Sequence, residues 1–344
     1  MVRHSSTWPC SDWREIEEDH MARSVVGIEI AEESVRAVEV TRGRHPQLVA
    51  AGEVRLPAGS ARDSDVLDAD AVATAVTTLW SQARIKSRKV VVALVNRRIL
   101  VRDYTAPNLP IEELSKALRY EAQDLIPVAP EDAVLDFYPL EVDGSQAKGL
   151  LVAGPADNVE SILNTLAKTK LRVDNVDFLP FGLARVAGRV VPEGFGPVAI
   201  VAVGEHTTSF VIAIDGIPRY VRVIAVDVAS ERSVRDDGAE VLVGGRRSMP
   251  SLVDGPESPV AEVIGRLSET LRFCRGQDDR LDPRELLLTG PLAPELAEPL
   301  AEALQIETRT ILPRDVIAVG SNLADADLPS SLMGALGIML DGGR

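Results

Sequence analysis

Two stretches of the chain share one pattern of apolar and polar residues. Residues 25–40 form a mostly apolar run, a short polar turn and a second apolar run, and residues 198–214 repeat that plan. A short apolar run bounded by turn residues is typical of a buried strand, so each stretch predicts a β-hairpin. The repetition indicates two halves of similar architecture with a cleft between them, and we expect the two turns to face each other across it.

The remaining pattern predicts alternating strands and helices, as in an α/β protein. Residues 89–178 form a β-α-β-β-α-β unit, and the Gly/Pro-rich segment 192–197 is the best boundary between the halves. Apolar residues at helical spacing predict a final helix over 330–340. Outside the 89–178 unit we expect further strands at 47–56, 218–224 and 285–289, and further helices at 70–84, 181–190, 260–275 and 292–304.

Length and charge narrow the class of protein. A chain of 344 residues predicts two domains or one bilobed domain, and 45% hydrophobic residues suffice for sizeable cores. The net charge of −15 argues against nucleic-acid binding and against direct docking on an anionic membrane. No apolar run reaches the roughly 20 residues that span a bilayer, and the first twenty residues lack a signal-peptide core. We therefore expect a cytoplasmic protein whose residues 1–22 are a disordered extension.

Candidate metal ligands are not grouped along the chain. Cys10 and Cys274 are the only cysteines, and the four histidines are scattered without ligand spacing. These positions predict neither a disulfide framework nor a metal site.

The turns of the two hairpins carry the residues that suggest a family. They resemble the phosphate-binding loops of the actin-like ATPases, and the PilM family of type IV pilus assembly in particular. By resemblance, both loops and the later adenosine loop imply a nucleotide site that is degenerate here, at Glu29, Ala31, Ser34, Arg36, Gly204, Thr207, Thr208 and Gly290; the last six of these keep favourable residue types.

The 89–178 unit extends this resemblance. It is similar to the small subdomain that PilM and the division protein FtsA carry, and its run 108–127 looks like the PilM version. The resemblance implies a bilobed actin-like, ribonuclease H-like fold with this subdomain inserted in the first lobe. The expected division is residues 23–88, 179–193 and 315–344 for the first lobe, 89–178 for the insertion, and 194–314 for the second lobe, with a reduced subdomain at about 230–284.

Several loop residues depart from what a nucleotide site needs. Glycines and hydroxyls normally let backbone N–H groups approach phosphates, whereas acids are useful only where they hold Mg²⁺. Here Glu32, Glu33 and Glu205 add negative charge, Ala202 removes a carboxylate and Pro291 removes an N–H. We therefore expect weak or absent Mg-ATP binding and little or no hydrolysis, with no catalytic residue assigned.

Three functions follow from the resemblance. The first is a scaffold that binds the cytoplasmic N-terminal tail of a PilN-like inner-membrane protein, and the pilus assembly ATPase is a further candidate partner. The second is an active actin-like ATPase or sugar-kinase relative, which the loss at Ala202 disfavours. The third is an FtsA-like division protein, which the missing membrane-binding tail disfavours. For the scaffold, the expected tail groove lies between the first lobe and the insertion, near Leu109, Leu114, Leu118 and Ile126.

Overall fold

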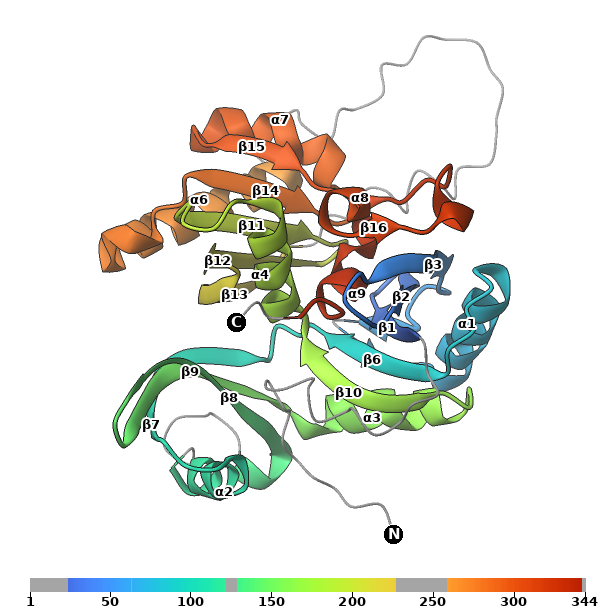
Figure 1. The fold of residues 1–344 in the computed structure, drawn as a ribbon, viewed down its shortest axis with the longest axis horizontal. Helices are drawn as coiled ribbons and strands as arrows, with labels where there is room; N and C mark the ends of the chain where they lie inside the picture. The colour runs from blue at the N-terminus through green and yellow to red at the C-terminus, as the bar shows by residue number, and fades with distance from the viewer. Residues whose placement is uncertain (1–23, 63, 122–128, 227–258, 342–344) are drawn as a thin grey trace.

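The structure, a computed structural model, describes residues 24–62, 64–121, 129–226 and 259–341 (Figure 1). The extension expected at 1–22 and residues 230–258 of the expected reduced subdomain lie outside this part of the chain. In the described residues the two largest sheets have six and five strands, and a separate sheet has three. The two larger sheets form the halves that the repeated hairpins predict.

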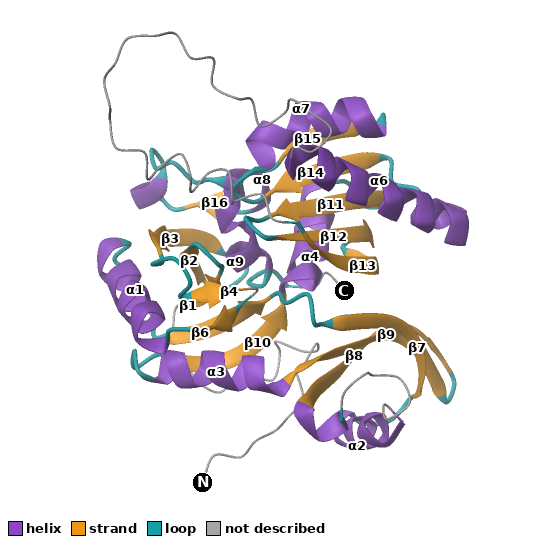
Figure 2. Cartoon of the chain, turned by 180° about the vertical axis from the view of Figure 1, so that it is seen from behind, coloured by secondary structure: helices purple, strands orange, loops and turns teal. Residues whose placement is uncertain are grey.

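The first lobe is built on the six-stranded sheet, in the order β10-β6-β1-β2-β3-β16. Its central hairpin is confirmed, with Ser24 opposite Thr41 and Ile30 opposite Val35. Helices α1 and α3 pack on one face of the sheet, and α4 (Leu179–Val190) and α9 (Met333–Gly337) on the other (Figures 1 and 2). The strands are β1 (Ser24–Ile30), β2 (Ser34–Thr41), β3 (Gln47–Arg55), β6 (Lys89–Leu94), β10 (Arg172–Phe178) and β16 (Ala318–Val319); the helices on one face are α1 (Ala69–Gln82) and α3 (Ala156–Ala167).

The second lobe repeats the centre of the first. Its sheet has the order β13-β12-β11-β14-β15. The hairpin β11–β12 is antiparallel and β14 is parallel to β11, just as β6 is parallel to β1 beside the β1–β2 hairpin. The elements are β11 (Pro197–Val203), β12 (Thr207–Ile214), β13 (Ile217–Ala225), β14 (Glu285–Thr289), β15 (Glu307–Thr310), α6 (Pro259–Gln277) and α7 (Ala293–Leu304). α4 also packs on this sheet and so lies between the lobes.

The expected grouping of residues 89–178 needs a correction. β6 and β10 are neighbours in the six-stranded sheet, and α3 packs on that sheet. β6 is almost entirely apolar and buried, which suits a strand inside a covered sheet, whereas β10 is of mixed polarity and lies at the edge of the sheet. Only β7 (Leu100–Pro107), α2 (Ile111–Glu121), β8 (Ala133–Asp143) and β9 (Gln146–Pro155) form the separate layer, in the order β7-β9-β8. We call these three strands the small sheet.

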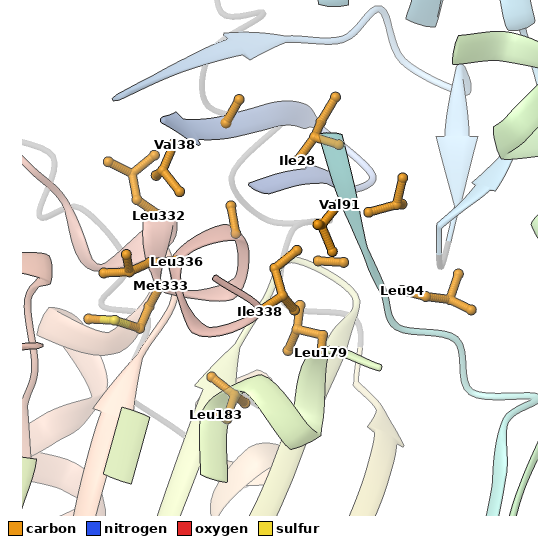
Figure 3. Packing of buried hydrophobic residues seen from close by; sticks show 14 of the residues in the cluster. Ile28, Val38, Val91, Leu94, Leu179, Leu183, Leu332, Met333, Leu336 and Ile338 are labelled. Carbon is orange, nitrogen blue, oxygen red and sulfur yellow. The ribbon is translucent and has the colours of Figure 1, made fainter. Parts of the chain in front are cut away.

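The C-terminal segment differs from the single helix predicted over 330–340. It forms a 3₁₀ turn, Ser330–Leu332, followed by the short helix α9 (Met333–Gly337). α9 lies between the lobes and packs its apolar side chains against β1, β6 and α4 (Figure 3). A Cβ on Gly337 would lie 2.8 Å from the backbone of Gly182 in α4, so the two helices approach closely because both positions are glycine.

Short elements complete the described chain. They are β4 (Ala61–Arg62), β5 (Asp65–Val66), α8 (Pro313–Val316) and the 3₁₀ turns Pro130–Asp132, Asp279–Leu281 and Ser321–Leu323.

Candidate functional site

The turns of the two lobe hairpins face each other, as the sequence predicts. The first is closed by Ala31 N–H donating to the Ser34 carbonyl over 2.9 Å, and the second by Gly204 N–H donating to the Thr207 carbonyl over 3.0 Å. The lobes are then joined by two side-chain contacts. Arg36 Nη2 lies 2.6 Å from Glu205 Oε1, and His206 Nε2 lies 3.0 Å from Glu32 Oε2.

Arg36 is the centre of a charged row across three strands. In the sheet register it lies opposite Glu29 on β1 and opposite Glu53 on β3. Its Nε is 3.0 Å from Glu53 Oε1 and its Nη1 is 3.5 Å from Glu29 Oε1. With Glu205, one buried guanidinium therefore meets three carboxylates. A buried ion pair is stable only with good geometry, because burial removes the hydration of both charges.

Burial and neighbouring charges shift the pKa values of Glu29, Glu53 and Arg36. Burial raises the pKa of Glu29 to about 7, although Arg36 opposes the shift. Burial alone would raise the pKa of Glu53, but the charge of Arg36 and hydrogen bonds hold that pKa below its usual value. The three carboxylates raise the pKa of Arg36 despite its burial, so it stays charged. Glu29 is thus the member of the cluster that changes charge near neutral pH.

A small cavity of about 40 Å³ lies beside this cluster, between the lobes. It has room for a few water molecules and is far smaller than the ligand pockets of 300–1,000 Å³ found in proteins. Gly290, whose φ is +98°, forms part of its wall, and a Cβ there would lie 2.3 Å from the Val203 carbonyl oxygen. The C-terminal turn closes the cavity, because Ser330 Oγ donates to the Gly290 carbonyl over 2.7 Å.

The structure brings most of the predicted loop positions to this one cavity. Five of them line it: Glu29, Arg36, Gly204, Thr207 and Gly290. Ala31 lies in the first turn, and Ser34 and Thr208 are buried at the starts of β2 and β12.

Sequence reasoning missed several polar members of the site, among them Glu53 and Ser331. Glu53 is a lone acid among small residues of β3, and its register opposite Arg36 was the signal that could have found it. Ser331 Oγ donates to Glu53 Oε2 over 2.9 Å. That contact crosses from the C-terminal turn to β3, and no local pattern predicts it.

The residues expected near a partner groove have different surroundings. Leu118 is buried in the core between α2 and the small sheet, and Leu114 packs against the same core. Leu109 is 39% exposed at the start of α2. Ile126 lies outside the described residues. Leu118 therefore supports this surface from within and does not form it.

None of the helices in the described ranges is long and apolar enough to span a membrane.

Known proteins match both the sequence and the fold. The sequence model of a family described as "Type IV pilus assembly protein PilM" matches residues 27–225. The solved "PilM-PilN type IV pilus biogenesis complex" is 25% identical with a TM-score of 0.77, over 91% of this chain and 96% of that chain. Curated protein sequences gave no match.

More distant structures give weaker likenesses. The cytoplasmic domain of EpsL, an inner-membrane component of the Vibrio cholerae type II secretion system, is 13% identical with a TM-score of 0.47, over 92% of this chain and 93% of that one. The ethanolamine utilization protein EutJ of Carboxydothermus hydrogenoformans is 12% identical with a TM-score of 0.49, over 92% and 90%. The family assignment does not depend on these distant structures. It rests on the sequence model, whose match over residues 27–225 covers more than half of the chain. The chain belongs to the PilM family of type IV pilus assembly proteins and has a bilobed actin-like α/β fold.

Proposed function

We propose that this protein is a cytoplasmic scaffold of type IV pilus assembly that binds the cytoplasmic N-terminal tail of a PilN-like inner-membrane protein. The observation that carries the proposal is the likeness to the PilM–PilN complex along nearly the whole chain. Binding to that tail would bring the protein to the inner face of the membrane. A contact with the pilus assembly ATPase stays a prediction.

We propose further that the nucleotide site is degenerate and hydrolyses little or no ATP. The cavity between the turns is too small for a nucleotide, and Arg36 is already compensated by three carboxylates. A phosphate brought to this site would meet Glu29, Glu205 and the Glu32–His206 contact. The residues present therefore do not fit Mg-ATP in this arrangement of the lobes.

The tail groove is proposed between the first lobe and the layer formed by α2 and the small sheet. Tyr120 near the end of α2 is 80% exposed, and Leu109, two residues before α2 begins, is 39% exposed. Exposed large apolar side chains at both ends of one short helix favour a contact with another chain. An extended tail there would gain main-chain hydrogen bonds and apolar contacts.

A binding assay with the tail peptide of the PilN-like partner tests this proposal. We expect saturable binding, weakened by the charge reversals Glu112→Lys or Arg119→Glu on α2. Glu298→Lys, an exposed change on α7 of the second lobe, is the matched control and should leave the affinity unchanged. Equal affinity in all the α2 variants would place the groove elsewhere, and absence of binding would contradict the scaffold function.

Cell fractionation tests the location. Expressed without its partners, the protein should remain in the soluble fraction, and co-expression of the PilN-like protein should move it to the membrane fraction. Strong pelleting of the protein by itself would contradict recruitment through a partner.

A further inference from the structure

One end of the first lobe carries a concentration of exposed cations. The chain enters the small sheet from the C-terminal end of β6, whereas the β2–β3 turn and the connections from α1 to β6 and from α3 to β10 lie at the N-terminal end. Figure 1 shows the small sheet and α1 on opposite sides of the six-stranded sheet. We call the six exposed cations at this end the basic row: Arg42, Arg44, Lys86, Arg88, Lys170 and Arg172.

The basic row follows the line of the strand ends. Arg172 begins β10, and its N–H donates to the Arg88 carbonyl just before β6 over 2.8 Å. The N–H of Lys86 donates to Oε2 of Glu39 on β2 over 2.9 Å, so the connection from α1 to β6 reaches across β1 to β2. The turn at 42–46 continues the line beyond β2. Neighbouring strands are about 4.8 Å apart, so the row measures about 14 Å from β10 to β2.

Most charges of the basic row are not compensated. Nε of Arg172 lies 3.2 Å from Oδ1 of Asp174. Within the described part of the chain, the other five side chains have no carboxylate at ion-pair distance. Glu39 also lies at this end, but it is buried and accepts the main-chain N–H groups of Lys86 and Ser87. Like charges repel each other, so an anion along the row would relieve that repulsion.

The residues that precede β1 carry too little charge to balance the row. Residues 1–23 contain five acids and three arginines, a net charge of −2. Five cations of the row have no carboxylate at ion-pair distance, so this segment would leave most of them uncompensated. The row is therefore available to another chain.

The shape of the row and the charge around it restrict the kind of partner. The whole chain has a net charge of −15 although it includes this row, so the remaining surface is strongly acidic. A membrane or a nucleic-acid duplex presents anions over a broad area and would meet that acidic surface as well. An extended protein segment is narrow. At about 3.3 Å per residue, about five residues cover the row.

We infer that the basic row is a docking surface for an extended acidic segment of another protein. Alternate side chains of an extended segment point to the same side, so Asp or Glu at every second position would face the row. The site goes beyond the proposed function, because it lies at the opposite end of β6 from the small sheet.

Defined peptides test this inference on the full chain without any pilus partner. The probe is a labelled, capped Glu-Ser-Glu-Ser-Glu-Ser-Glu peptide, and its counterpart carries Gln in place of every Glu. At about 50 mM salt, fluorescence anisotropy should show saturation at about 1 mM or below for the acidic peptide and at least about tenfold weaker binding for the Gln peptide. Raising the salt to about 500 mM should also weaken the acidic peptide about tenfold, because screening shortens the range of the attraction.

A combined variant removes half of the row. Arg44→Gln, Lys86→Gln and Arg88→Gln together should weaken the acidic peptide about tenfold, since each exposed ion pair makes a small contribution. All three side chains are exposed, and the hydrogen bonds of Lys86 and Arg88 at this end come from their main chains. A thermal melt should therefore show cooperative unfolding of this variant.

Arg266→Gln, Arg272→Gln and Arg275→Gln on α6 form the matched control. They make the same change in net charge at three exposed positions of the second lobe. The affinity for the acidic peptide should stay within about twofold of the native value, because only charges of the row contact the peptide.

Four results would overturn the inference. The first two are no saturable binding of the acidic peptide and equal binding of the Gln peptide. The third is an equal loss of affinity in the two combined variants. The fourth is peptide binding that appears only after the acids of residues 15–19 are replaced by amides, which would assign the row to the chain's own segment.

A vesicle assay separates the protein partner from a lipid surface. Sedimentation with phosphatidylglycerol vesicles should show no binding that depends on the row. Binding to these vesicles that the row variant loses, without peptide binding, would make the row a membrane-docking surface and overturn the inference. None of these results bears on the tail assay, so failure of this site and failure of the scaffold function are distinguishable.

Discussion

Nη2 of Arg36 in the first lobe donates a hydrogen bond to Oε1 of Glu205 in the second lobe over 2.6 Å. Here a buried arginine and a carboxylate make a bridge from the chain's own residues. The same arginine also compensates Glu29 and Glu53, so its removal affects both lobes.

The first prediction concerns the stability that Arg36 provides. Arg36→Met would leave Glu29, Glu53 and Glu205 close together with no cation between them. Loss of one partner of a buried pair costs about 3–5 kcal/mol, and we expect about 3 kcal/mol because Glu53 is partly exposed. Urea unfolding measures the change in the free energy of unfolding.

Arg42→Met is its control, since Arg42 is exposed just beyond β2. A surface change of this kind should stay within about 0.5 kcal/mol. A loss below about 1 kcal/mol in Arg36→Met would show that the cluster is not a stabilising bridge.

The second prediction concerns pH. The pKa of Glu29 is raised from its ordinary value of 4.5 to about 7 in the folded protein, so the folded state binds the proton more tightly. The stability from this proton is full below about pH 4.5 and is lost as the pH rises through 7. Glu29→Gln cannot ionise. We therefore expect its stability, relative to the native protein, to increase by roughly 2.5 kcal/mol between pH 5 and pH 8.

Urea unfolding of both proteins at pH 5, 6, 7 and 8 measures this difference. The comparison cancels the contributions of all other titrating groups, because both proteins contain them. A difference in stability that does not change with pH would mean that Glu29 is ionised throughout.

Much of the fold could be predicted from the sequence because the pattern is local. Both lobe hairpins appear at the expected residues, since each apolar run and its turn lie within one short stretch. The sheet to which β6 and β10 belong was not predictable from that pattern. The place of β6 depends on its pairing with β1, and the place of β10 depends on its pairing with β6; both partners are far away in the sequence.

The candidate site, too, could be predicted only where its contacts are local in the sequence. The opposition of Glu29 and Arg36 follows from a tight turn between β1 and β2. The contact of Arg36 with Glu205 depends on how the lobes meet. The predicted final helix is shortened for a similar reason, because Gly334 and Gly337 serve close contacts with Glu29 and α4 and lower the helix propensity.

The third prediction tests one of those contacts. A Cβ at Gly334 would lie 2.3 Å from Glu29 Oε2 and 2.8 Å from Leu179 Cδ1. Gly334→Ala should therefore destabilise the protein by about 1–3 kcal/mol, measured by urea unfolding. Gly265→Ala in α6 is the control, because a Cβ there meets nothing within 4 Å and alanine favours the helix by up to about 1 kcal/mol. Equal effects of the two changes would show that Gly334 is not tightly packed.

The fourth prediction concerns nucleotide. Millimolar Mg-ATP should not raise the melting temperature of the native protein, whereas a ligand at a hundred times its dissociation constant adds about 2.7 kcal/mol and a few degrees. The structure indicates which acids matter. Glu205 and Glu32 lie at the cleft in contact with Arg36 and His206, whereas Glu33 is exposed.

The combined change Ala202→Asp, Glu32→Ser and Glu205→Ser should therefore produce a Mg-dependent rise in the melting temperature. It frees Arg36 for a phosphate, restores a carboxylate beside the cavity and removes two acids, each of which costs a nearby phosphate on the order of 1 kcal/mol or more. Glu33→Ser serves as the control and should give no rise, because its side chain points to solvent. A clear rise in the native protein would contradict the degenerate site. A rise in Glu33→Ser alone would place the unfavourable charge in the exposed turn and not in the bridge between Arg36 and Glu205.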